Sequence, residues 1–181
     1  NFLYIKALGS PWVQFNGHTL NLSHRQIEIL CILALHPHGI GLEELHYALY
    51  GERSVSLKTL KAELSQLRSL LPHSIEARIY RLSCEVQCDF LRAEQSLNAN
   101  LISSTFSLYK GSFLSKSESP LLSTWRHCFD ARLSQLIYQI KDIDQLLRII
   151  GQTHDRIDAV QRLLELLPQD SIHRNYFSNL I

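Results

Sequence analysis

The 181-residue sequence contains no methionine, and it has no apolar run near the roughly 20 residues that a transmembrane helix requires. Its N-terminus also lacks the basic and then apolar layout of a signal peptide. We therefore expect a soluble, cytoplasmic protein that does not enter a membrane. Because the chain opens at Asn1 inside a strand-like stretch, we expect it to be part of a longer protein whose missing segment is N-terminal.

Net charge is also nearly absent, since 18 Lys and Arg residues stand against 17 Asp and Glu residues and leave +1 at pH 7. This balance excludes a strongly basic nucleic-acid coat protein, so any contact with DNA has to come from local clustering of basic side chains. The hydrophobic fraction of 45% is enough to build a core in a chain of this length, which excludes a disordered protein.

The four cysteines do not form the paired pattern of a secreted disulfide protein or of a zinc knuckle. Cys84 and Cys88 are four residues apart, but no second pair of ligands is positioned to complete a tetrahedral zinc site. The sequence also lacks a Gly-rich phosphate loop, an H-E-x-x-H motif and a G-x-S-x-G motif, and its acids and histidines form no compact set. We therefore expect no enzyme activity, no catalytic residues, no metal and no cofactor.

The most regular pattern lies between Ser54 and Pro72, where leucines recur at spacings of three and four. Such spacing places them on one stripe of a helix of about four turns, and this stripe must face a core. The stripe consists of Leu57, Leu60, Leu64, Leu67 and Leu71. The opposite face is small, polar and basic, which suits phosphates and base edges in a major groove. An ordinary amphipathic helix with one solvated face would show the same pattern, so the flanking segments have to decide.

The segments before this helix predict a small antiparallel sheet and a pair of helices. Asn16-Gly17 suits the tight turn of a hairpin, and Ser23 with Gln26 forms a capping-box pattern at the start of an apolar helix that ends near His36. A second short helix is expected from Leu42 to Gly51. The strands are expected at residues 3–8, 12–15 and 19–22.

After the leucine-rich helix, residues 74–77 and 79–82 predict a hairpin with the size and position of a wing. Strands, two helices, a longer helix and a hairpin follow one another in the order of a winged helix-turn-helix domain. We therefore predict an α+β fold with a small antiparallel sheet, followed by an all-α region. The expected domains are residues 1–88 and 89–181.

The second half of the sequence predicts helices throughout. They are expected at residues 90–97, 100–109, 123–150 and 155–167, with a last helix ending at residue 181. The last two resemble a single tetratricopeptide-like hairpin. This half either packs against the first domain and stabilises it or binds a partner, because an unpaired helical hairpin needs a neighbour to bury its open face.

Two segments resemble the OmpR-type winged-helix family, namely LSQLRSLL at residues 64–71 and Tyr80-Arg81-Leu82 in the predicted wing. The closer resemblance is to the output domains of bacterial transcription regulators that carry a GAF sensor upstream. Their layout is similar to that of activators with a helical transcription-activation domain. The resemblance covers roughly residues 3–122 and is carried by residues 22–30, 34–39, 42–51 and 61–68, and then by 109–114 and Trp125-Arg126.

This resemblance implies a sequence-specific DNA-binding transcriptional regulator that forms the output part of a longer sensor protein. A recognition helix at about residues 56–71 would enter the major groove, and a wing at about 74–83 would contact the backbone. The expected partners are double-stranded DNA, RNA polymerase and a second copy of the chain, with the helix at 123–150 as the dimer interface. The alternative is a protein-interaction module that binds RNA polymerase, a sensor domain or itself without touching DNA.

Candidate DNA contacts lie on the exposed side of the predicted recognition helix and around it. The set is Lys58, Thr59, Ser65 and Gln66 on bases or phosphates, Lys61 and Arg68 on phosphates at the margins, Ser69, Arg78 in the wing and Arg25 at the start of the first helix. Arg68 could instead pair with Glu63 or Glu44. Gln66 stands where the family usually has Arg, and Ser69 replaces a common basic residue. The amide of Gln66 is geometrically suited to adenine.

Overall fold

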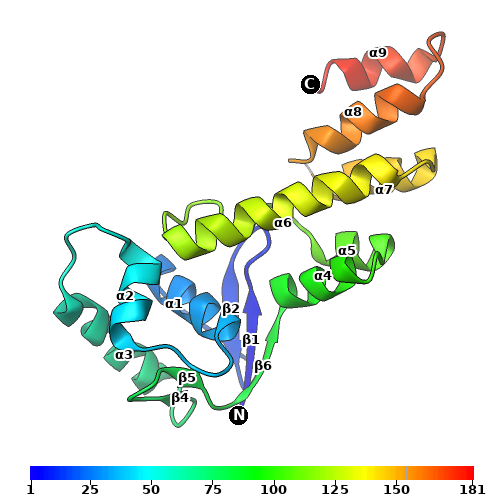
Figure 1. Cartoon of the computed structure of the whole chain (residues 1–181). Coiled ribbons are helices and arrows are strands. Elements are labelled where there is room, and N and C mark those ends of the chain that lie inside the picture. Colours follow the sequence, from blue (N-terminus) through cyan, green and yellow to red (C-terminus); the bar gives the residue numbers. More distant parts are fainter. Residues whose placement is uncertain (154) are drawn as a thin grey trace.

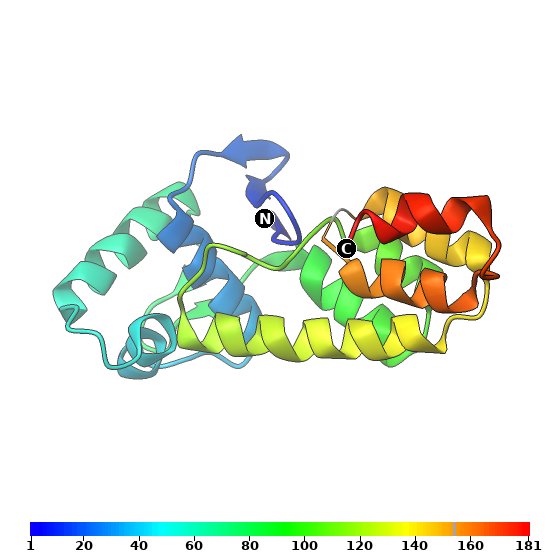
Figure 2. The same ribbon diagram turned by 90° about the horizontal axis from the view of Figure 1, so that it is seen from above.

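The computed structural model describes residues 1–153 and 155–181. A small sheet and the first three helices form one end of the molecule, and the later helices form the other (Figure 1). The longest helix, α6, runs beside both ends, as the view from above also shows (Figure 2). The predicted α+β architecture, with an all-helical second part, is confirmed.

The sheet has four strands in the order β3-β2-β1-β6. Strands β1 (Phe2–Lys6), β2 (Trp12–Phe15) and β3 (His18–Leu20) are antiparallel, as predicted, and positive φ angles at Asn16 and Gly17 make the tight turn between the last two. Strand β6 (Glu85–Cys88), which was not predicted, pairs in parallel with β1. Its four residues are too few for a clear period, and its partner lies at the other end of the domain's sequence.

Helices α1 (His24–Leu35), α2 (Leu42–Tyr50) and α3 (Leu57–Leu70) follow the sheet. The capping box of α1 is confirmed, because the Ser23 hydroxyl accepts from the Gln26 N–H and the Gln26 side chain accepts from the Ser23 N–H. Ser56 caps α3 through a hydrogen bond from the Thr59 N–H.

The predicted wing is present as the short hairpin β4 (Ile75–Glu76) and β5 (Arg81–Leu82) beside α3. It is fastened to the loop between α1 and α2, since the backbones of Ile40 and Tyr80 exchange two hydrogen bonds of 3.0 and 2.9 Å. The position of the wing relative to α3 therefore depends on this loop as well as on its own short ladder.

The second half contains α4 (Asp89–Asn98), α5 (Ile102–Leu108), α6 (Pro120–Gln139), α7 (Ile143–Gln152), α8 (Ile157–Leu166) and α9 (Ile172–Ser178). None of the helices in the described part of the chain combines the length and apolarity needed to cross a membrane.

The prediction of one helix from Ser123 to Ile150 is wrong. The helix begins earlier, at Pro120 after the Ser119 cap, and it ends at Gln139. The Asp142 carboxylate then caps a separate helix, α7, by accepting from the N–H groups of Asp144 and Gln145. The apolar spacing continues across this break because both helices bury one side, so periodicity alone did not reveal it.

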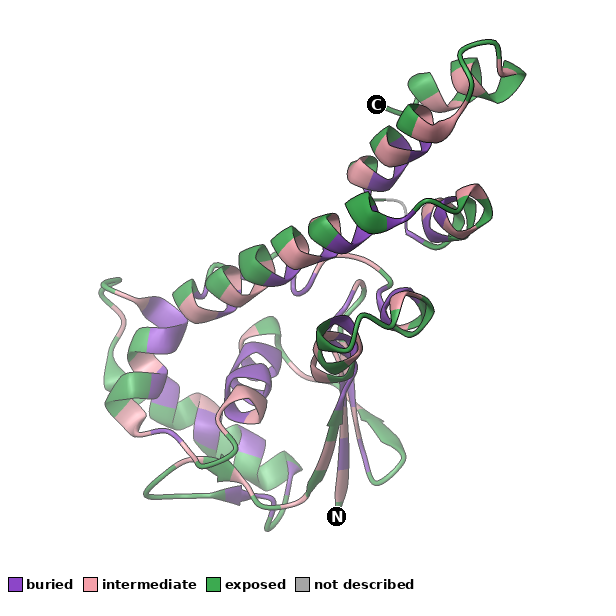
Figure 3. Ribbon diagram, turned by 45° about the vertical axis from the view of Figure 1, so that its right-hand side comes forward, coloured by how far each residue is buried: buried purple, intermediate pink, exposed green. Residues whose placement is uncertain are grey.

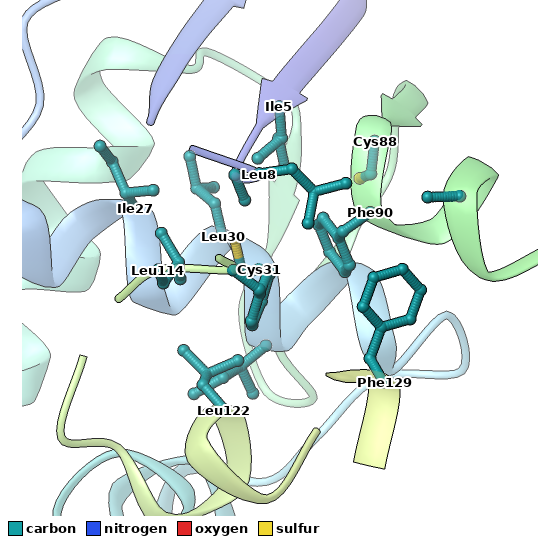
Figure 4. Close-up of a cluster of buried hydrophobic side chains, with 14 of the residues drawn as sticks. Ile5, Leu8, Ile27, Leu30, Cys31, Cys88, Phe90, Leu114, Leu122 and Phe129 are labelled. Atoms are coloured by element: carbon teal, nitrogen blue, oxygen red, sulfur yellow. The ribbon is translucent and has the colours of Figure 1, made fainter. Parts of the chain in front are cut away.

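A single continuous core connects the two halves. Helix α1 is buried along most of its length (Figure 3). Figure 4 shows side chains from β1, α1, α4 and α6 packed together in this core, among them Ile5, Leu30, Phe90, Leu122 and Phe129. The predicted division at residues 88 and 89 falls where β6 passes directly into α4, and it stays a prediction.

Asp89 fastens the start of α4 to the end of β1. Its buried carboxylate accepts hydrogen bonds from the backbone N–H groups of Ala7 (2.8 Å), Leu8 (3.0 Å) and Phe90 (2.8 Å). Burial raises the pKa of Asp89, while the three N–H groups act in the opposite direction because they favour the charged carboxylate.

Replacing Asp89 with Asn tests this connection. One carboxylate oxygen becomes an NH2 group that faces a backbone N–H, so we expect the free energy of unfolding to fall by about 1–3 kcal/mol. Urea denaturation at pH 7 measures the change. Asp170→Asn, in the exposed turn between α8 and α9, is the control and should change stability little. Equal effects of the two substitutions would contradict the structural role of Asp89.

Candidate nucleic-acid interface

Helix α3 has one face fixed in the core and one face free. Leu60, Leu64 and Leu67 are 0, 2 and 0% exposed, whereas Leu57, predicted to belong to the same stripe, is 37% exposed. The opposite side carries Lys58, Thr59, Lys61, Ala62, Ser65, Gln66, Arg68 and Ser69, all exposed. All the predicted contact residues of this helix therefore share one surface, which we call the α3 face.

Three basic side chains, Lys58, Lys61 and Arg68, make up the charge of the α3 face. Within residues 1–153 and 155–181, none of the three forms an ion pair, and the alternative pairing of Arg68 with Glu63 or Glu44 does not occur. Their charges are available to an external anion.

The hydroxyl groups of the α3 face are partly used within the helix. Thr59 Oγ1 lies 3.1 Å from Ser56 Oγ at the helix cap, and the Ser69 hydroxyl donates to the carbonyl of Ser65 at 3.1 Å. Ser69 is therefore oriented along the helix, while the Ser65 side chain points into solvent.

Gln66 accepts a hydrogen bond from Gln26, a residue expected only in the cap of α1. The Gln26 side chain, in a residue that is 6% exposed, donates from Nε2 to Gln66 Oε1 at 3.0 Å. No local signal links positions forty residues apart, so only the packing of α1 against α3 reveals this contact.

Arg25 contacts two side chains of the protein itself. Its guanidinium lies 2.7 Å from a carboxylate oxygen of buried Glu28 and 4.5 Å from the ring centroid of Tyr50. Glu28 also accepts a short hydrogen bond from Ser117, in the segment that leads into α6. A phosphate would have to share Arg25 with Glu28, and the predicted DNA contact of this residue stays a prediction.

Among the residues that the structure describes, Arg78 in the wing has no ion-pair partner. Arg78 is exposed at the tip of the hairpin with a φ of +59°, next to Ile79, which is 57% exposed. Arg81, in contrast, pairs with Glu76 across the two strands at 2.8 Å. Of the two wing arginines, Arg78 is the one available to a nucleic-acid backbone.

The described residues contain no cluster of three or more His, Cys, Asp or Glu side chains that could hold a metal ion. Burial raises the pKa of Cys88 to about 12, and it also raises the pKa of Cys84. A metal needs the thiolate form, so these two cysteines are poorly suited as ligands at neutral pH.

Comparison with known proteins bears on the fold. No family model matches the chain. It is 28% identical over 153 residues to an uncharacterized 47.3 kDa protein in the thcA 5′ region of Rhodococcus erythropolis, covering 84% of this chain and 35% of that protein. The structure of Mycobacterium tuberculosis EmbR in complex with a low-affinity phosphopeptide superimposes with a TM-score of 0.56 at 17% identity.

The chain shares the fold of EmbR. The match covers 98% of this chain and 55% of that one, so it includes both the winged helix-turn-helix part and the helical part. The predicted resemblance to OmpR-type winged-helix proteins with a following helical region is thereby confirmed at the level of fold. The chain spans about a third of its curated relative and about half of the EmbR chain.

Substitutions on the two faces of α3 should differ strongly in their effect on stability. Leu64→Ala removes a side chain that is 2% exposed, so we expect the free energy of unfolding to fall by about 2–5 kcal/mol. Ser65→Ala, one position along, should change it by less than about 0.5 kcal/mol. Chemical denaturation of both variants measures this. A large loss with Ser65→Ala would show that the α3 face contacts the protein itself.

Proposed function

We propose that this chain is a sequence-specific, double-stranded-DNA-binding transcriptional regulator. The observation that carries the proposal is the α3 face, on a helix whose other side is fixed in the core. Several polar side chains project from it, together with three basic ones that form no ion pair within residues 1–153 and 155–181. The winged helix-turn-helix fold shared with EmbR supports the same function. Residues 1–88 would bind DNA, and residues 89–181 would contact other proteins.

In this proposal α3 lies in the major groove. Lys58, Lys61 and Arg68 bind phosphates along the groove margins, and Gln66 and Ser65 face base edges. Arg78 at the wing tip contacts the backbone beside the groove. Few cations take part, in keeping with the net charge of +1, so the interaction has a shallow salt dependence.

Loss of single cations from the α3 face tests the proposal. We expect Lys58→Ala and Arg68→Ala each to weaken binding across all duplex sequences, and each to lower the slope of log K against log salt by about one, because one phosphate contact is lost. Fluorescence anisotropy with duplexes selected from a random pool, titrated at several salt concentrations, measures both quantities.

Lys141→Ala and Arg148→Ala are matched controls, since both residues are exposed in the second half of the chain. They should leave affinity and slope unchanged. Unchanged binding in both α3 variants would refute the assigned face, and no binding of wild-type protein to any duplex at 50 mM salt would refute the function.

A homodimer on a two-fold DNA site also fits the proposal, because one recognition helix covers only a few base pairs. The predicted interface in the second half needs revision, since α6 buries Phe129, Leu133 and Ile137 within the chain. Within residues 123–150, the predicted interface, the large apolar side chains that stay exposed are Tyr138 and Leu147, which remain candidates for the contact. Sedimentation of the DNA-bound and free protein determines the stoichiometry.

A second candidate function is partner binding, favoured by an apolar groove of about 1060 Å³ between α2 and α6. Ile40, Ala48 and Trp125 belong to its lining, and Glu43 and Glu44 are exposed in the first turn of α2. The described residues that line the groove include no Lys or Arg. Its charge and apolar surface fit a partner helix with an apolar stripe flanked by Lys or Arg.

A helical peptide of Leu and Lys is a suitable probe, with a Leu and Glu peptide of the same length as its control. Trp125 fluorescence in a Trp12→Phe chain reports binding, because these are the two tryptophans of the sequence. We expect the basic peptide to bind more tightly than the acidic one, and Glu43→Gln to reduce this preference. Equal binding of the two peptides would contradict the proposed partner chemistry.

A further inference from the structure

Gln26 connects the cap of α1 to Gln66 on the α3 face. Its Oε1 accepts from the Ser23 backbone N–H at 3.0 Å, and its Nε2 donates to Gln66 Oε1 at 3.0 Å. Gln26 is 6% exposed, whereas Gln66 is exposed. A buried amide therefore stands directly behind an exposed one.

The orientation of both amides follows from the backbone. A backbone N–H can only donate, so Gln26 must turn its oxygen to Ser23. The NH2 group of Gln26 then points to Gln66 and requires an acceptor, so Gln66 turns its oxygen toward α1. The two N–H donors of Gln66 are left for the solvent side of α3.

We propose that Gln26 is a positioning residue that makes Gln66 a hydrogen-bond donor toward DNA. This inference rests on the proposed function. In the major groove, guanine presents the acceptors N7 and O6 and thymine presents O4, whereas cytosine presents only its N4 amino donor. A donor held in this orientation favours guanine or thymine at the base that Gln66 contacts and disfavours cytosine.

Adenine has both an acceptor and a donor in the major groove, and a paired contact with it needs the amide oxygen as well as the NH2 group. Gln26 occupies one acceptor site of that oxygen. From the sequence, the amide of Gln66 was expected to suit adenine. The contact with Gln26 changes this expectation, because it favours donation from the Gln66 NH2 group over a paired contact with adenine.

The substitution Gln26→Glu tests the inference because it reverses the polarity of the buried group and retains its length. A Glu side chain at this position still accepts from the Ser23 N–H, so the capping box and the helix are preserved. When this Glu is ionised, its second oxygen can only accept, and Gln66 must then turn its NH2 group inward and its oxygen outward.

The full 181-residue chain is used to select duplexes from a random pool, in parallel with the variants Gln26→Glu, Gln66→Ala and Gln87→Glu. We expect Gln66→Ala to lose base preference at one position of the selected site. Gln26→Glu should shift the preference at that same position from guanine or thymine toward cytosine or adenine, by about fivefold or more in relative affinity.

Gln87→Glu, on the exposed side of β6, adds the same charge without touching Gln66. Repulsion from an added negative charge lowers affinity for every duplex alike, so it leaves the relative preferences of this control unchanged. The midpoint of thermal unfolding of Gln26→Glu, measured by circular dichroism, shows that the variant is folded before selection.

The outcomes separate the two proposals. If wild-type protein selects no duplex, the proposed DNA-binding function fails. If wild-type protein selects a site and Gln66→Ala alters one position, but folded Gln26→Glu keeps the wild-type preference there, the positioning role of Gln26 is refuted. A wild-type site in which Gln66→Ala alters no position also refutes it, because Gln66 then contacts no base.

Discussion

The arrangement of the two halves depends on the hydrogen bonds that the buried carboxylate of Asp89 accepts. The carboxylate accepts from the N–H groups of Ala7 and Leu8 just beyond the end of β1, and Asp89 begins α4. The segment before α6 is hydrogen-bonded to the residues that follow β1. The Leu114 N–H donates to the Ala7 carbonyl, and the Gly9 N–H donates to the Ser112 carbonyl. The sheet and the helical half are thereby joined through backbone groups near one carboxylate.

This junction determines what lies behind the α3 face. With residues 7–9 and 112–114 held together, α1 is enclosed and becomes the central support of the winged part. Helix α3 packs its leucines near α1, and the first turn of α1 supplies Gln26 to Gln66. Arg25 lies in the same turn and pairs with Glu28, one turn further along α1. Glu28 in turn accepts a hydrogen bond from Ser117, in the segment before α6. One end of α1 therefore contacts both the candidate DNA-binding surface and the helical half.

The similarity to EmbR at 17% identity shows that this fold tolerates extensive change in sequence. The parts that position α3 are apolar side chains and backbone hydrogen bonds, for which many residue combinations are equivalent. The exposed face is not constrained in this way, so its charge and its amide groups can differ between proteins with the same fold. The low charge of the α3 face and the pairing of Gln66 are therefore properties of this chain rather than of the architecture.

The sequence by itself determined the local elements. The capping box at Ser23, the turn at Asn16-Gly17, the leucines of α3 and the wing all depend on residues a few positions apart, and each was predicted correctly. The set of exposed residues on α3 followed from the same helical period. Leu57 was the exception, because this first residue of α3 lies at the edge of the core and is 37% exposed.

Only the tertiary structure decided which distant groups meet. It paired β6 with β1, joined Glu28 to Ser117 and placed Gln26 behind Gln66. Each of these depends on hydrogen-bond or charge partners brought together by packing, and periodicity in the sequence carries no information about such partners. The sequence therefore identifies the surface that faces DNA in the proposed function, whereas the direction in which the amide of Gln66 points depends on a buried neighbour from another helix.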